Sequence, residues 1–140
     1  MFENTYLWRS TLAPQNTDEF GPQRERLRTA YLSLRENAKQ LVSLIPSDCK
    51  GLTVHDITHL DALWEMGSLI CGEGFQINPS EAFVLGAAIL LHDAGMSIAS
   101  YPGGMPQLLE TTEWRDNAAS TLKRHSIPVS PETIINPPTT

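Results

Sequence analysis

The sequence predicts an all-α fold, on three observations. Each long periodic segment follows the helical repeat, and none alternates at the two-residue period of a strand. An apolar run from Ala82 to Leu91 has the length of a buried helix and is too short to cross a bilayer. Just before it, Asn78, Pro79 and Glu81 carry the capping signals with which helices begin. Together these signals indicate a bundle of helices.

The elements are expected as follows. Residues 1–21 show no clear period and read as an arm or loop. A strong helix then starts at Gly21-Pro22, where proline suits the first turn, and ends at Pro46. Its apolar positions recur at steps of four and three on one side of the helix: Leu27, Tyr31, Leu34, Ala38 and Leu41. A one-sided stripe must be covered, so this helix is expected to pack against others.

A second helix is expected from about Thr53 to Cys71, between the breakers Gly51 and Gly72. Its buried side includes Val54, Ile57, Leu60 and Trp64. The third helix contains the apolar run and should stop at Gly95. Because it is apolar all round, we expect it to be the central helix of the bundle.

Beyond the third helix the sequence becomes irregular, with a turn-rich loop at residues 101–104. A modest helix is expected from Pro106 to about Arg124. The last residues are rich in proline and threonine and show no sign of packing. The expected parts are therefore an arm (1–21), a helical domain (22–125) and a flexible tail or the start of a further segment (126–140).

Composition limits the classes of function. The formal net charge of −6 argues against a broad basic surface for nucleic acid. The start of the chain lacks the basic residues and apolar run of a signal peptide. The two cysteines, Cys49 and Cys71, have no CxxC spacing, which fits a reduced environment. We expect a cytoplasmic protein without a membrane partner, and the sequence gives no direct evidence for a nucleic-acid partner.

The chemistry is concentrated at helix ends. His55 and His59 are four residues apart, which would place both imidazoles on one face of the second helix. His92 and Asp93 close the third helix. A carboxylate is unfavourable there, since it follows a buried apolar run and lies at the end where the helix dipole disfavours negative charge. Each pattern alone is more often structural, but the combination predicts metal binding by this set.

The segments TVHDITHLDALW, NPSEAFVLGAAILLHDAGM and ASYPGG resemble the HD superfamily of metal-dependent phosphohydrolases, over about residues 25–105. They are most similar to the branch found at the start of long bacterial proteins that also carry a gyrase/histidine-kinase-type ATPase module. The resemblance implies an HD-type helical bundle, of which this chain would hold the N-terminal portion. It also implies a downstream ATPase-type domain as partner. The apolar helices need more cover than these residues offer, so we also expect a second subunit or a further segment to pack against them.

The resemblance assigns roles residue by residue. His59, His92 and Asp93 would bind the divalent metal, which can be Mn²⁺, Mg²⁺, Fe²⁺, Co²⁺ or Zn²⁺ for such a mixed set. Asp93 would also bridge two metals or orient the attacking water. His55 stands where cyclic-nucleotide phosphodiesterases of the superfamily keep a proton donor, although it could equally support a ligand or the helix start. Asp56 is a further auxiliary candidate.

One expected ligand has no clear counterpart. The family's last metal-binding aspartate lies well downstream of the His-Asp pair, and Asp116 is too close for that role, so it reads as a surface charge. His125 is an auxiliary candidate, although its neighbours Lys123 and Arg124 favour a basic surface segment. Either the missing aspartate lies outside these residues, or the site is degenerate.

Three hypotheses follow. The first is a divalent-metal phosphohydrolase acting on a nucleotide or other small phosphoester. The second is a catalytically degenerate HD module that senses a ligand or partner and regulates an attached domain. The third is a purely structural fragment that binds no metal. The sequence does not choose among possible phosphoesters, because specificity lies in the shape of the pocket.

Overall fold

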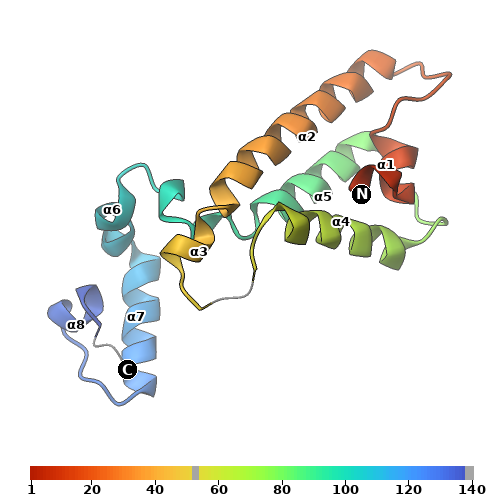
Figure 1. Cartoon of the computed structure of the whole chain (residues 1–140). Helices are drawn as coiled ribbons and strands as arrows, with labels where there is room; N and C mark the ends of the chain where they lie inside the picture. Colours follow the sequence, from red (N-terminus) through yellow and green to blue (C-terminus); the bar gives the residue numbers. More distant parts are fainter. Residues whose placement is uncertain (52–53, 138–140) are drawn as a thin grey trace. The chain divides into compact units, whose positions relative to one another are not determined.

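The structure, a computed structural model, describes residues 1–51 and 54–137. Helices and 3-10 turns are the regular elements of these residues, and no strand occurs among them, which confirms the all-α prediction (Figure 1). The chain divides into two compact units, residues 1–97 and 98–140. No helix in the described ranges combines the length and the apolar character needed to cross a membrane.

The first unit is built around α5. Its elements are η1 (Phe2–Asn4), α1 (Tyr6–Thr11), α2 (Gly21–Val42), α3 (Ile45–Asp48), α4 (Ile57–Cys71), α5 (Pro79–Leu91) and η2 (Ala94–Met96). Helix α5 packs most extensively against α2 and also against α4 and α1. Figure 1 shows it between α2 and α4. The side of α5 that faces these helices buries Ala82, Gly86 and Leu90.

Residues 1–21, which were expected to form an arm or loop, contain the helix α1. In the structure α1 begins after Thr5, whose side chain accepts a hydrogen bond from the Trp8 amide. The Thr5 hydroxyl also accepts a hydrogen bond from the Trp64 indole at 3.0 Å. The amide of Leu7 donates to the hydroxyl of Ser68 at 3.1 Å. These contacts tie α1 to α4 and make the N-terminal residues part of the core.

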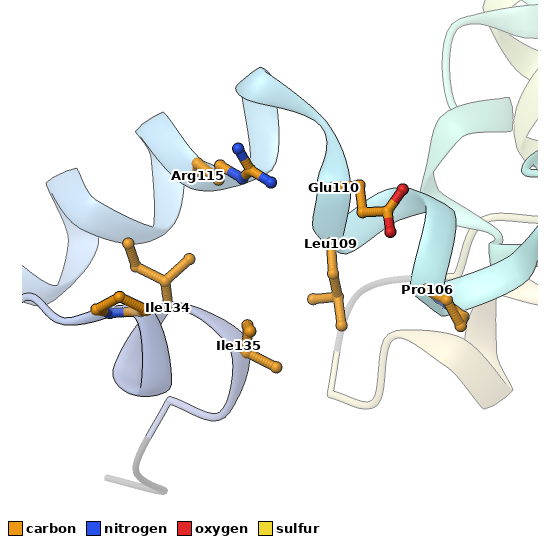
Figure 2. A pocket seen from close by; sticks show the side chains of 7 residues that line it. Pro106, Leu109, Glu110, Arg115, Ile134 and Ile135 are labelled. Atoms are coloured by element: carbon orange, nitrogen blue, oxygen red, sulfur yellow. The ribbon is translucent and has the colours of Figure 1, made fainter.

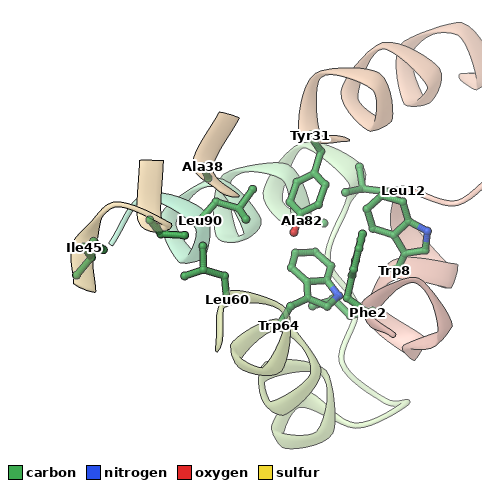
Figure 3. Packing of buried hydrophobic residues seen from close by; sticks show 12 residues of the cluster. Phe2, Trp8, Leu12, Tyr31, Ala38, Ile45, Leu60, Trp64, Ala82 and Leu90 are labelled. Atoms are coloured by element: carbon green, nitrogen blue, oxygen red, sulfur yellow. The ribbon is translucent and has the colours of Figure 1, made fainter. Parts of the chain in front are cut away.

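An aromatic cluster occupies the centre of this core (Figure 3). The ring centroids of Trp8, Tyr31 and Trp64 lie 5.4 to 6.2 Å apart, and Phe2 packs edge-on against Trp8 at 5.1 Å. Such tilted and edge-on pairs are favourable for aromatic rings. Burial raises the pKa of the Tyr31 hydroxyl far above its ordinary value. The cluster joins residues of α1, α2 and α4 in one packed unit.

The start of α4 differs in part from the prediction. Thr53, the expected start, lies outside the described residues. Helix α4 begins at Ile57, behind Asp56 as its cap. Val54 was expected on the buried side but is 69% exposed, because it precedes the helix. Leu60 and Trp64 are buried as predicted.

Helix α5 begins as the sequence predicts. The Asn78 side chain accepts from the amides of Ser80 and Glu81, and the Glu81 carboxylate accepts from the Asn78 amide. The helix ends at Leu91, and a 3-10 turn carries the chain past Gly95. On the outer side of α5 three large apolar residues are exposed: Val84, Leu85 and Leu91.

The second unit contains η3 (Ile98–Ser100), α6 (Gly104–Glu110), α7 (Thr112–Arg124) and α8 (Pro131–Ile135). The single helix expected from Pro106 to Arg124 is in fact two helices. Thr111 has an extended backbone and caps α7 by accepting from the Trp114 amide, which breaks the helix there. A groove between residues of α6, α7 and α8 has a volume of about 640 Å³ (Figure 2).

The tail, expected to be unpacked, also contains a helix. Ser130 caps α8 through a reciprocal pair of hydrogen bonds with Thr133. The indole of Trp114 donates to the Ile134 carbonyl at 3.0 Å, which holds α8 against α7. A five-residue helix is too short to show a periodic pattern, so only its Ser130-Pro131 start could have indicated it.

A glycine pair provides a test of the core. A Cβ at Gly86 would meet the ring of Tyr31 and lie 2.7 Å from Cζ3 of Trp64, whereas nothing lies within 4 Å of a Cβ at Gly67. We predict that Gly86→Ala lowers the free energy of unfolding by about 1–3 kcal/mol, because buried rings must move. Gly67→Ala, in α4, should instead stabilise the protein by up to about 1 kcal/mol through helix propensity.

Urea denaturation followed by circular dichroism measures both effects. Equal changes in the two variants would contradict the close packing of α5 against these rings.

Candidate metal centre

Asp56 is the N-cap of α4, the helix that carries His59. Its Oδ1 accepts hydrogen bonds from the amides of Thr58 at 2.9 Å and His59 at 3.1 Å, and from the Thr58 hydroxyl. These hydrogen bonds hold the pKa of Asp56 below its usual range, and the bond from the Thr58 hydroxyl has the largest effect. The cap fixes the first turn of α4, and with it the backbone of His59.

His55 and His59 do not share a helix face, contrary to what their four-residue spacing predicts. His55 precedes the cap Asp56 and therefore lies outside α4. They nevertheless converge, with ring centroids 5.5 Å apart. The chain bends at Asp56, just before α4 begins, and the two side chains meet from the two sides of this bend.

Asp93 is the common partner of all three histidines. It is 8% exposed, and it follows His92, the C-cap of α5. Its Oδ2 lies 2.8 Å from Nδ1 of His55, 2.9 Å from Nε2 of His92 and 3.6 Å from Nε2 of His59. One carboxylate oxygen thus lies close to three ring nitrogens.

The two segments that carry the histidines meet at this point. The rings of His59 and His92 lie 5.7 Å apart and are tilted by 47°. The imidazole at the start of α4 and the imidazole that follows α5 therefore converge, as the predicted metal site requires. The group that could hold a metal ion consists of His55, His59 and Asp93, whose ligand atoms all lie within 4.8 Å of one another. His92 contacts the same carboxylate oxygen from beside this group.

The hydrogen bond of His92 bears on how a cation would fit. Nδ1 of His92 lies 2.7 Å from the carbonyl oxygen of Ile89, which can only accept, so Nδ1 carries a proton. Nε2 then faces Asp93 either as the second N–H of an imidazolium or with its lone pair. In the second state a cation shared with Asp93 removes the repulsion between the lone pairs. An imidazole held by a backbone carbonyl is the arrangement typical of metal-ligating histidines.

The chemistry of the donors fits a divalent metal. Imidazole nitrogens and one carboxylate oxygen are suitable ligands for first-row metals. A buried carboxylate at the end of a helix is also unfavourable without a balancing charge. The residues present therefore fit the predicted cofactor in both type and position.

The remaining predicted residues are placed elsewhere in the chain. Asp56 is the cap of α4 and is not a member of the metal-holding group. His125 is the exposed C-cap of α7, and Asp116 is exposed on the same helix, both in the second unit. An auxiliary role for Asp56 or His125 stays a prediction.

Sequence reasoning missed the residues that hold the turn after Asp93. The buried hydroxyl of Ser97 donates to Oδ2 of Asp48 at 3.0 Å. The thiol of Cys49 donates to the carbonyl of Met96 at 3.3 Å. These partners are 47 to 49 positions apart in the sequence, so no local pattern could have indicated them.

The comparison with protein families decides the family. The family model described as HD-CE matches residues 49–131, which is more than half of the chain and includes every histidine of the site. The chain belongs to the HD-CE family. This HD-type match starts later than the resemblance traced over about residues 25–105 and extends to the start of α8. No curated protein and no solved structure gives a significant match.

The cap of α4 can be tested separately from metal binding. Asp56→Ala should lower the free energy of unfolding by about 1 kcal/mol, because two amides at the start of α4 lose their acceptor. Asp56→Asn keeps an acceptor oxygen and should stay close to wild type. Chemical denaturation measures both variants. A stable Asp56→Asn variant that lost Mn²⁺ binding would show instead that Asp56 is a ligand.

Proposed function

We propose that this HD-CE domain is a divalent-metal-dependent phosphohydrolase that acts on a nucleotide or another small phosphoester. The observation that carries the proposal is the convergence of His55, His59 and His92 on one buried oxygen of Asp93. The HD-type family match supports a phosphoester as the class of substrate.

In this proposal His59 and Asp93 are the centre of the metal site, since both the resemblance and the geometry include them. His92 presents Nε2 to the same oxygen and completes the set. A bound divalent ion would lower the pKa of a water ligand and polarise a phosphoryl oxygen. Mn²⁺, Mg²⁺, Fe²⁺, Co²⁺ and Zn²⁺ all suit these donors.

Two alternative roles are open to His55, that of a metal ligand and that of a proton donor. Its Nδ1 lies 2.8 Å from Asp93, which is close enough for it to share the ion. The resemblance instead assigns it the donation of a proton to the leaving oxygen, a general-acid role that imidazole commonly fills. We propose the second role, with the hydrogen bond to Asp93 orienting the ring.

A second candidate function is a regulatory HD-CE module that binds metal or ligand without turnover. One observation favours it: the metal-holding group found among the described residues has a single carboxylate. The resemblance also leads us to propose a downstream ATPase-type domain or a second subunit as partner. The exposed apolar side of α5, with Val84 and Leu91, supports further cover by such a partner.

Metal binding is the first test. We predict that wild-type protein binds Mn²⁺ and that Asp93→Ala weakens binding by at least about tenfold, because the shared oxygen is lost. Asp116→Asn is the matched control, since it removes an exposed carboxylate on α7. Isothermal titration calorimetry gives the affinities, and metal analysis of the purified protein gives the content.

Hydrolysis of bis(p-nitrophenyl) phosphate with Mn²⁺ separates the two candidate functions. Turnover that disappears in Asp93→Ala supports the hydrolase, whereas bound metal without turnover favours the regulatory module. A wild-type protein that binds none of the five metals would refute the hydrolase.

The role of His55 is the second test. For a phosphoester with a strongly basic leaving group, loss of the proton donor in His55→Gln should lower kcat by about 100-fold or more. The Mn²⁺ affinity of this variant should stay near that of wild type. The effect should shrink for a substrate whose leaving group is already a weak base, such as p-nitrophenolate. A drop in affinity equal to that of His59→Gln would show that His55 is a ligand instead.

A further inference from the structure

The turn that carries Asp93 is held differently from the helix before it. Helix α5 ends at Leu91, and Asp93 lies between this helix and the 3-10 turn η2. The carbonyl of Asp93 accepts a hydrogen bond from the Met96 amide at 2.9 Å, which closes the turn. The direction of the Asp93 side chain therefore depends on where the turn ends, at Met96 and Ser97.

That end is attached to α3. Ser97 is fully buried, and its hydroxyl donates to Oδ2 of Asp48, the last residue of α3. The next residue, Cys49, donates its thiol hydrogen to the Met96 carbonyl. Helix α3 is itself fixed, because Ile45 is 1% exposed and belongs to the main hydrophobic cluster. The last residue of α3 and its C-cap thus hold the last residue of η2 and its C-cap.

We propose that Asp48, acting through Ser97, is a positioning residue for the Asp93 carboxylate. The inference rests on the proposed metal site and adds a determinant of its geometry. A carboxylate shared by three imidazoles tolerates little displacement, because a shift toward one nitrogen lengthens the distances to the others. Holding the turn at both ends restricts Asp93 to the position in which all three histidines are within reach.

A purely structural anchor would affect stability alone, so the test separates stability from metal geometry. The variants are Asp48→Ala and Ser97→Ala, with Asp48→Asn as the conservative change that keeps an acceptor for Ser97. Leu7→Ala is the control for lost stability: Leu7 is buried in α1, and its amide is bonded to Ser68 near the other end of α4 from His59. All are compared at a temperature where circular dichroism shows them folded.

We expect Asp48→Ala and Ser97→Ala to weaken Mn²⁺ binding by about 10- to 100-fold, the range typical for partners behind metal ligands. The visible absorption bands of the Co²⁺-loaded protein should shift in both, because they report the ligand geometry. Asp48→Asn should recover most of the affinity and the wild-type spectrum. Leu7→Ala should lower the unfolding midpoint and leave affinity and spectrum unchanged.

Unchanged affinity and spectrum in folded Ser97→Ala would overturn the inference while leaving the metal site intact. A wild-type protein that binds neither Mn²⁺ nor Co²⁺ would overturn both. If the alanine variants do not fold, Cys49→Ala removes the neighbouring attachment. A shifted Co²⁺ spectrum in that variant supports the positioning role of this anchor, and an unshifted one contradicts it.

Discussion

The candidate metal centre depends on one nearly buried carboxylate, that of Asp93. Asp93 is placed at the C-terminal end of a helix whose body is apolar, where both desolvation and the helix dipole oppose a negative charge. Three imidazoles surround its Oδ2. A charge kept in such a position is typical of a functional site, because folding alone would favour an apolar residue there.

The rest of the unit keeps the two halves of this site together. The cap at Asp56 orients the start of α4, and the capping box at Asn78 fixes the start of α5. Between these helices and α2, the rings of Tyr31 and Trp64 pack onto the backbone at Gly86. Since a side chain at position 86 would collide with them, this glycine permits the close approach of α5 to the helices that carry the two rings.

The sequence was informative where the signal is local. The capping residues of α5, the stripe of α2 and the chemical types at His59, His92 and Asp93 could all be read from short segments. The short helices could not be predicted, because α1 has six residues and α8 has five, fewer than a periodic pattern requires. The convergence of His55 and His59 was predicted from a helical spacing that the structure does not contain. The bond between Ser97 and Asp48 joins positions too distant for any pattern of spacing.

The uncovered side of α5 has a consequence for the behaviour of the domain in water. Val84, Leu85 and Leu91 are exposed on it, and the neighbouring α4 exposes Met66, Leu69 and Ile70. Two acids of α4 are paired, Asp61 with Arg35 and Glu65 with the N-terminal amine, but the protein as a whole carries a formal net charge of −6. Mutual repulsion between acidic molecules then opposes the attraction between apolar surfaces. Because dissolved salt screens the first force and leaves the second, ionic strength sets the balance between dispersed and associated chains.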